Sequence, residues 1–319
     1  ASETIQTPVV TFQSGGAAIT DSSITYNNTS GNTWTAAYTA NSSDTNGTVS
    51  YSIAFTDSNG NAGTAVTSGT GSVTFDKTVP TLSNVSIASN NANTALAKVN
   101  NVITLSMTAS ETISTPVVTF QSGGAAITDT SITYVNTSGN TWTAAYTANI
   151  SDTNGSVSYS IAFSDSAGNA GVAVTSGSGS VTFDKTAPVL SQVTAILTPS
   201  NDTTPSYIFT TTEAGTLSTN ISQGVSTSTS VSTGSNQTIT FNTLPEGTYA
   251  NKTITVTDAA GNAGSLTIPT FVIDTTSPNM TITAVEVSDG DASNDTTLSL
   301  TFTSSEATSN FIQSKKRSW

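Results

Sequence analysis

The 319-residue sequence contains no cysteine and no histidine. No disulfide can therefore stabilise the fold, no thiol chemistry is available, and zinc is not expected because its commonest ligands are missing. Charged residues make up only 8% of the chain, against roughly 25% in an average globular protein. With seven Lys and Arg in total, little is available to steer or polarise a substrate, so we do not expect an enzyme.

The formal net charge of −13 excludes further classes of partner. The chain offers little positive charge to balance the phosphates of a nucleic acid or an anionic membrane surface. No apolar run approaches the roughly 20 residues of a membrane span. We therefore expect neither nucleic-acid binding nor membrane insertion.

Serine, threonine, asparagine, glycine and alanine take the place of the missing charge. Such a composition is also typical of linkers. Here it is interleaved with short runs such as VVTF at 117–120 and SIAF at 160–163. Because Thr, Val, Ile, Tyr and Phe suit a half-buried pleated surface, the pattern favours folded β-sheet over disorder.

The sequence is internally repeated. Residues 2–80 recur at 110–188, a shift of 108, with ten differences over 79 positions. A diverged copy follows, in which DAAGN at 258–262 corresponds to DSAGN at 165–169, and DTTSP at 274–278 corresponds to DKTAP at 184–188. A unit of 90 to 108 residues has the size of an immunoglobulin-like (Ig-like) β-sandwich, so we predict an all-β chain of tandem sandwiches forming an elongated rod.

The phase of the repeats predicts two complete sandwiches between two incomplete ones, as in a piece of a longer array. The expected units are a partial repeat lacking its first two strands (1–75), a complete repeat (76–183), a complete, diverged repeat (184–273), a partial repeat with only its first strands (274–310) and a non-repeat tail (311–319). The tail holds three of the seven basic residues and is most simply foreign to the array, although a short basic anchor is an alternative.

Turn residues separate seven short segments within the unit 76–183. Strands are expected at 81–87, 101–109, 116–121, 131–135, 141–148, 156–164 and 172–183. Seven strands with a turn signal between neighbours are the pattern of one sandwich. In the next unit, Pro245 and Tyr249 resemble the corner between the fifth and sixth strands of such domains.

Most of the 20 acidic residues recur at matching positions of the repeats, and three positions stand out. They are the aspartate that opens each unit (Asp76, Asp184, Asp274), the glutamate after the second strand (Glu3, Glu111, Glu213, Glu306), and the Asp and Asn of the last hairpin (Asp57 with Asn61, Asp165 with Asn169, Asp258 with Asn262). In a seven-strand sandwich these positions share the pole next to the preceding unit, so we expect their oxygens to converge. Such oxygens suit Ca²⁺, which would relieve their mutual repulsion and stiffen the junction.

Each motif also has a simpler interpretation. The sequence Asp-x-x-Gly-Asn forms a plain hairpin turn, and the proline at the start of each unit stiffens a linker without metal. A second acidic stretch, containing Asp289, Asp291, Asn294 and Asp295, has an uncharged counterpart at 90–93 and is expected to be a solvated loop.

The DKTAP linker at 184–188, the DSAGN hairpin at 165–169 and the near-identical repeats resemble the bacterial Ig-like domains of giant surface adhesins. The resemblance covers residues 1 to about 306. It implies a secreted or surface-tethered spacer, stiffened by Ca²⁺, that holds a distal binding domain away from the cell. The motif residues are complete at junctions 75–81 and 184–190, whereas the junction at 274 has only half of them because the last unit lacks its final hairpin.

Other functions remain open at this point. A glycan-binding accessory module would need exposed aromatics, and Trp34 and Trp142 fall in expected strands, where a core or sheet-face position is simpler. A subunit of a filament, surface layer or biofilm matrix is another alternative. In that case the strand pair of the last unit could complete the first unit of another chain, a route to self-association. The expected partners are otherwise neighbouring repeats of the same chain, and the distal ligand is unknown.

Overall fold

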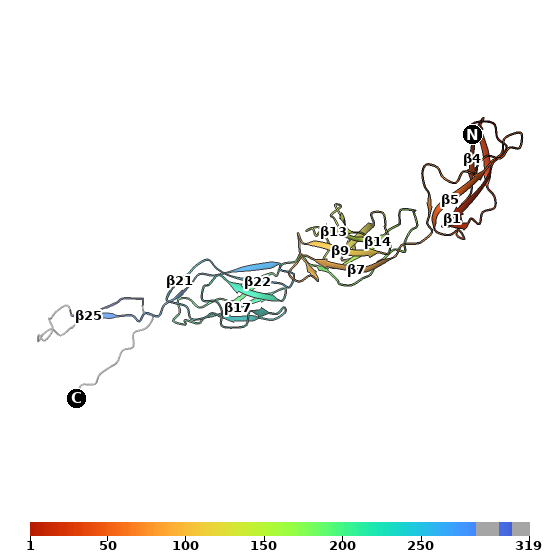
Figure 1. Ribbon diagram of the computed structural model, residues 1–319. Helices are drawn as coiled ribbons and strands as arrows, with labels where there is room; N and C mark the ends of the chain where they lie inside the picture. Colours follow the sequence, from red (N-terminus) through yellow and green to blue (C-terminus); the bar gives the residue numbers. More distant parts are fainter. Residues whose placement is uncertain (285–299, 308–319) are drawn as a thin grey trace, which may run out of the picture. The chain divides into compact units, whose positions relative to one another are not determined.

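The computed structural model describes residues 1–284 and 300–307 of the chain. Every helix or strand assigned within these residues is a β-strand (Figure 1), and no helix that could cross a membrane occurs in this part of the chain. The chain divides into two compact units, residues 1–186 and 187–319. The acidic stretch from Asp289 to Asp295 and the basic tail 311–319 lie outside the described residues.

The second repeat is a complete sandwich of two sheets, with strand orders β12-β13-β9-β7 and β11-β10-β14-β15-β8. The strands of the first sheet are β7 (Leu82–Ser89), β9 (Val102–Ala109), β12 (Thr133–Ser138) and β13 (Thr141–Thr147). Those of the second are β8 (Leu96–Ala97), β10 (Val117–Ser122), β11 (Ala125–Ala126), β14 (Gly155–Ala162) and β15 (Thr182–Phe183). This is the strand arrangement of an Ig-like domain, as predicted.

The core of the second repeat lies between its two sheets. Strand β9 alternates strictly, so that Ile103, Leu105 and Met107 all face inward and are fully buried. Phe120 of β10 and Tyr146 of β13 meet from opposite sheets with ring centroids 4.8 Å apart. Trp142, placed by the sequence in a strand, is half-buried and packs against this core.

The last strand of the second repeat is divided, which the sequence did not predict. Only Thr182–Phe183 forms a strand of the expected segment 172–183. Val174 bridges Ile161 of one sheet, whereas Ser178 bridges Ser86 of the other. Gly177 and Gly179 allow this change of partner, because an added Cβ on either would collide with a backbone carbonyl of β7.

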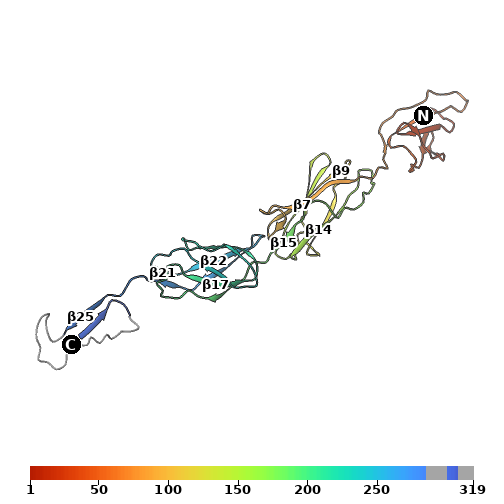
Figure 2. The same ribbon diagram turned by 90° about the horizontal axis from the view of Figure 1, so that it is seen from below.

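The third repeat forms the core of the second unit (Figure 2). Its strands form sheets of order β16-β17-β20, β19-β18-β22-β23 and β21-β24. Their bounds are β16 (Leu190–Thr194), β17 (Ser206–Thr211), β18 (Gly215–Thr219), β19 (Ser230–Val231), β20 (Gln237–Thr240), β21 (Gly247–Tyr249), β22 (Lys252–Thr257), β23 (Ala263–Ile268) and β24 (Phe271–Ile273). The Tyr249 hydroxyl donates to the Pro245 carbonyl over 2.8 Å, which confirms the predicted corner. A separate hairpin of β25 (Met280–Ala284) and β26 (Leu300–Ser304) follows.

The first repeat has nearly the same sequence as residues 110–183 of the second, but its described residues form fewer strands than the complete second repeat. A sheet of order β2-β1-β5-β6 faces the hairpin β3-β4. The bounds are β1 (Val9–Ser14), β2 (Ala17–Ala18), β3 (Thr25–Ser30), β4 (Thr33–Ala37), β5 (Gly47–Ala54) and β6 (Thr74–Phe75). Ile53 is half-buried here, whereas its counterpart Ile161 is fully buried. The difference follows from strands β7 and β9, whose residues share the core with Ile161 and which have no counterpart among the described residues of the first repeat.

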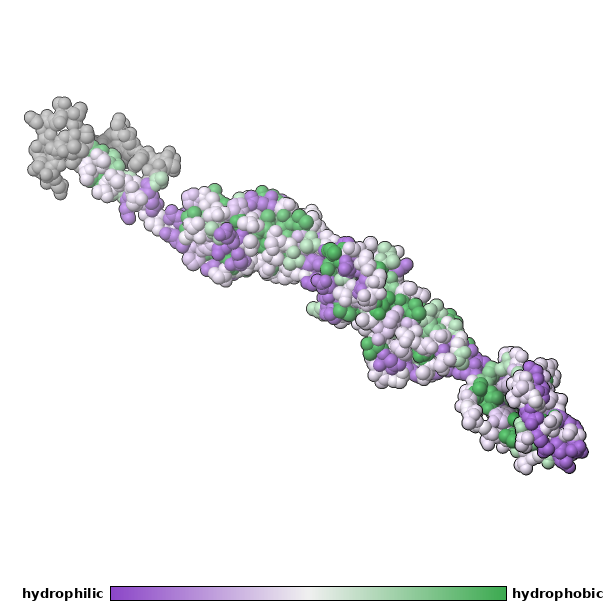
Figure 3. Space-filling model, turned by 90° about the horizontal axis from the view of Figure 1, so that it is seen from above, coloured by the Kyte–Doolittle hydropathy of each residue, from purple (hydrophilic) through white to green (hydrophobic). Residues whose placement is uncertain are grey.

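The surface agrees with the scarcity of charge. Figure 3 shows mostly pale, intermediate hydropathy with separate green and purple patches over the described residues. Exposed apolar side chains such as Val9 and Val117, 63% and 62% accessible, are scattered along strand faces, as is usual for soluble sheets.

Candidate metal centre

The linker after the first repeat is held by the side chain of Asn46. Asn46 Nδ2 donates to Asp76 Oδ1 over 3.0 Å and to Thr78 Oγ1 over 2.6 Å, while Asn46 Oδ1 accepts the Lys77 amide over 3.0 Å. Asp76 Oδ1 also accepts the Thr78 amide over 2.9 Å. Three consecutive linker residues are therefore tied to one side chain of the first repeat.

Lys77 adds a second tie to the same loop. Its Nζ donates to the carbonyl oxygens of Ser42 and Asp44 over 2.8 and 2.7 Å. The Asp44 side chain is buried, and its carboxylate accepts the backbone N–H groups of Thr20 and Asn41, which fixes the loop that presents these carbonyls. We call Asn46 and Lys77 the linker clamp.

The same clamp recurs at the end of the second repeat. Asn154 donates to Asp184 and Thr186 over 3.2 and 2.7 Å, and the Lys185 ammonium donates to two carbonyls of the loop at 150–152. Sequence reasoning missed the clamp, although its residues are among the positions that the duplication keeps. In the third repeat Glu246 takes this place by accepting from Thr275 and Thr276, and these hydrogen bonds hold its pKa below the usual range.

The last hairpin of the second repeat meets the linker from the other side. Asp165 is 3% exposed, and its two oxygens accept the Asn169 amide N–H and side-chain Nδ2, each over 2.8 Å. Asn169 Nδ2 also donates to the Asp76 carbonyl over 3.0 Å. Because Asn169 hydrogen-bonds the Asp165 carboxylate, the pKa of Asp165 lies below its ordinary value. Asn169 thus orients Asp165 and fastens the hairpin to the linker through its amide nitrogen.

Gly171 lets the hairpin approach the linker this closely. An added Cβ would lie 2.8 Å from the Pro80 carbonyl oxygen and would also collide with the Phe163 ring. Neither the proline backbone nor the buried ring can yield easily. A glycine is therefore favoured at this position both by the Phe163 ring, as at Gly63 against Phe55 in the first repeat, and by the contact between hairpin and linker.

Glu111 completes an acidic group at this pole. It follows β9, and one oxygen each of Asp76, Glu111 and Asp165 lie within 4.8 Å of one another. Burial, followed by the negative charges of Asp76 and Asp165, raises the pKa of Glu111. The sequence-predicted residues Asp76, Glu111, Asp165 and Asn169 are thus brought together.

The geometry of this group fits a calcium ion. Ca²⁺ binds oxygens at about 2.3–2.6 Å, so two ligands on opposite sides of one ion lie about 5 Å apart. The 4.8 Å limit on the three oxygens is compatible with that sphere. Asp76, Glu111 and Asp165 would hold the ion, and its charge would offset both the burial of Glu111 and its repulsion by Asp76 and Asp165.

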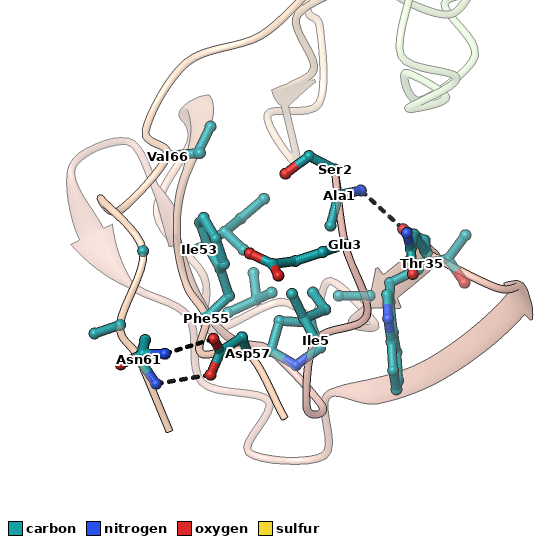
Figure 4. Close-up of a pocket in the computed structure, with 17 residues that line it drawn as sticks. Ala1, Ser2, Glu3, Ile5, Thr35, Ile53, Phe55, Asp57, Asn61 and Val66 are labelled. Carbon is teal, nitrogen blue, oxygen red and sulfur yellow. Dashed lines mark hydrogen bonds between the residues drawn. The ribbon is translucent and has the colours of Figure 1, made fainter. Parts of the chain in front are cut away.

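The other predicted residues are placed as follows. Glu3 and Asp57 line one pocket of the first repeat, where Asn61 donates to Asp57 as Asn169 does to Asp165 (Figure 4). Residues 1–75 contain no counterpart of the linker aspartate, so the described first repeat offers two of the three carboxylates.

The later junctions are only partly described. Asp184 belongs to the first unit, whereas Glu213, Asp258 and Asn262 belong to the second, so their convergence stays a prediction. Within the second unit, Asn262 donates to both oxygens of Asp258 over 2.9 Å. Asp274 accepts the Thr276 amide, and Glu306 follows β26.

Comparison with known protein families also identifies Ig-like domains in this chain. A family model described as "Bacterial Ig-like domain (group 3)" matches residues 32–184, and one described as "Bacterial Ig-like domain" matches residues 198–275. No curated protein matches the chain.

Among solved structures, a tetra-tandem repeat in the extending region of a large adhesion protein is 19% identical. The match covers 89% of this chain and 71% of that one, with a TM-score of 0.28. A tandem-domain fragment of titin is 13% identical over 83% of this chain and 88% of that one, with a TM-score of 0.37. Scores this low carry no inference, so identification rests on the two family models and on the observed sandwiches. The chain is a tandem array of bacterial Ig-like domains.

Proposed function

We propose that the chain is a spacer segment of a secreted or cell-surface bacterial adhesin, stiffened by Ca²⁺ between its first and second repeats. The observation that carries the proposal is the position of Asp76. Its carboxylate is tied to Asn46 of the first repeat and lies with Glu111 and Asp165 of the second. Ig-like repeats are a non-enzymatic kind of domain, which agrees with a mechanical role.

The ion would act on the linker together with the clamp. Asn46 and Lys77 hold the linker on the first repeat without any metal. A cation shared by Asp76, Glu111 and Asp165 would hold the same linker on the second repeat. With both ends of so short a connection fixed, the two repeats would lose freedom to bend, which is the property that a spacer requires.

Calcium binding to the intact chain tests the proposal, with a matched pair of variants. Glu111→Gln removes one carboxylate of the group, whereas Glu3→Gln makes the same change at the equivalent but more exposed position of the first repeat, and residues 1–75 hold no linker aspartate. Isothermal titration should show one fewer bound Ca²⁺ for Glu111→Gln and no loss for Glu3→Gln. At a free Ca²⁺ concentration 100 times Kd, linkage adds about 2.7 kcal/mol to the stability of the liganded domain. For a repeat of this size that corresponds to a rise in melting temperature of about 10 °C. Equal binding by both variants, or no binding by the wild-type chain, would overturn the proposal.

A further inference from the structure

The carboxylate of Asp76 stands between the linker clamp and the acidic group. Its Oδ1 accepts hydrogen bonds from Asn46 Nδ2 over 3.0 Å and from the Thr78 amide over 2.9 Å. One oxygen of Asp76 also lies within 4.8 Å of oxygens of Glu111 and Asp165. With two donors already on Oδ1, Asp76 Oδ2 is the oxygen left for a cation. Because the carboxylate is a rigid planar group, the hydrogen bonds on Oδ1 also fix the direction of Oδ2.

Asn46 is presented by a well-fixed loop of the first repeat, between β4 and β5. On one side of it, the buried Ser14 donates from its Oγ to the Thr45 carbonyl over 2.7 Å. On the other side, Gly47 lies so close to Gly15 that an added Cβ would stand 2.7 Å from the Gly15 Cα. Both contacts recur around the equivalent asparagine of the complete second repeat. The loop is therefore built into the repeat, and it holds the Asn46 side chain in one place.

The second repeat holds Asp76 by its main chain. The Asp76 carbonyl accepts a hydrogen bond from Asn169 Nδ2 over 3.0 Å, and the same Nδ2 donates to Asp165 Oδ2 over 2.8 Å. The side chain of Asp76 is thus oriented by the first repeat, whereas its main chain is fixed by the second. Removing the bond from Asn46 would release the rotation that carries Asp76 Oδ2 away from Glu111 and Asp165.

The third repeat shows that holding a linker and orienting its aspartate are separable. There Glu246 holds the linker by accepting hydrogen bonds from Thr275 and Thr276. The Asp274 carboxylate is bound by the Thr276 amide over 3.1 Å. An ionised carboxylate at the clamp position has no N–H group to donate to the aspartate, whereas the amide of Asn46 has two. Asparagine at this position therefore adds an orientation of Asp76 that attachment of the linker does not require.

We propose that Asn46 of the first repeat is a positioning residue for the cation site of the second, so that calcium affinity is coupled to attachment of the linker. The inference rests on the proposed calcium site and adds that the neighbouring repeat sets its affinity. Loss of a group that orients a metal ligand weakens metal binding by about 10–100-fold. Asn46 is only half-buried, and the Thr78 amide stays on Asp76, so the lower end of this range is expected. Coupling of two equilibria is reciprocal, so bound Ca²⁺ strengthens the clamp by the same factor.

Calcium titration of the intact chain tests the positioning role at this one site. Binding is followed through the NMR signal of the Asn169 side-chain amide, which donates to both Asp165 and Asp76. Asn46→Ala should raise the Kd for Ca²⁺ about tenfold. Thr78→Val is the matched control, because it removes one hydrogen bond of Asn46 but leaves both donors on Asp76 Oδ1. That variant should bind Ca²⁺ as wild type does, and an equal change of Kd in the two variants would overturn the role of Asn46.

The reciprocal effect is measured in the wild-type chain by hydrogen exchange. Saturating Ca²⁺ should slow exchange of the Lys77 amide, which donates to Asn46 Oδ1 over 3.0 Å, by about tenfold. Glu111→Gln should abolish this slowing, because it removes a carboxylate of the site and leaves the clamp intact. If the Asn169 signal of wild type does not respond to Ca²⁺, the calcium site itself is refuted, and the coupling with it. If that signal responds while Lys77 exchange stays at its metal-free rate, the calcium site stands and only the coupling is refuted.

Discussion

The linker clamp makes Asn46→Ala an informative substitution, because it removes three hydrogen bonds and leaves every carboxylate of the acidic group in the sequence. These are the bonds from Asn46 Nδ2 to Asp76 and to Thr78, and the bond from the Lys77 amide to Asn46 Oδ1. A net hydrogen bond contributes about 0.5–1.5 kcal/mol, which gives about 3 kcal/mol for three. Water reaches these partly exposed groups and replaces part of the lost bonding. We therefore expect the substitution to lower the free energy of local opening of the linker by about 1–2 kcal/mol.

Amide hydrogen exchange measures this opening directly. Since about 1.4 kcal/mol corresponds to a factor of ten, the Lys77 amide should exchange about tenfold faster in the variant. Asn28→Ala is the control, because Asn28 donates only to the Gly31 carbonyl within the β3-β4 hairpin. That variant should leave Lys77 exchange unchanged. An Asn46→Ala chain that folds and still protects Lys77 as wild type does would refute the clamp.

Three further substitutions test the core, the acidic group and the tyrosine corner independently. Ile161→Ala should cost about 3 kcal/mol as a buried core truncation, whereas the matched Ile53→Ala, already half exposed, should cost less than half of that in chemical denaturation. Glu111→Gln should raise the metal-free melting temperature at about pH 7, and the gain should vanish towards pH 4, because burial and the nearby charges raise the pKa of Glu111 in the folded state, so that its ionised form costs stability and its protonated form does not. Tyr249→Phe should lower thermal stability of the third repeat by about 1 kcal/mol through loss of its bond to Pro245. Equal losses of stability for Ile161→Ala and Ile53→Ala, a melting temperature that does not rise at pH 7 in Glu111→Gln, or an unchanged stability of Tyr249→Phe would contradict the cause given for that substitution.

Local pattern was sufficient for most of the fold. Strand β9 alternates between inward and outward residues along its whole length, and glycine or asparagine marks the neighbouring turns. The expected strand at 101–109 therefore lies within one residue of the observed Val102–Ala109. The segment 172–183 was wrong as one strand, because Gly177 and Gly179 serve contacts with β7, about 90 residues earlier. Contacts with residues so distant in the sequence produce no periodic pattern in the local sequence.

The candidate site also contains residues that the sequence could group and residues that it could not. Glu111, Asp76 and Asp165 could be grouped from topology alone, because loops that return to one pole of a sandwich must meet. The linker clamp could not, since Asn46 and Lys77 are 31 residues apart and look like an ordinary turn and an ordinary surface cation. The near-exact duplication held a signal, because both residues survive at 154 and 185. That signal does not say which residues touch.

The central claim, that calcium fixes the first repeat on the second, is tested most directly by a distance distribution between the two. Val9→Cys and Val117→Cys occupy exposed, equivalent positions of the two repeats in a chain that has no other cysteine. Spin labels at both sites should give a broad distribution in metal-free buffer that narrows with Ca²⁺, and Glu111→Gln should prevent the narrowing. A distribution of unchanged width in wild-type chain saturated with Ca²⁺ would contradict the account.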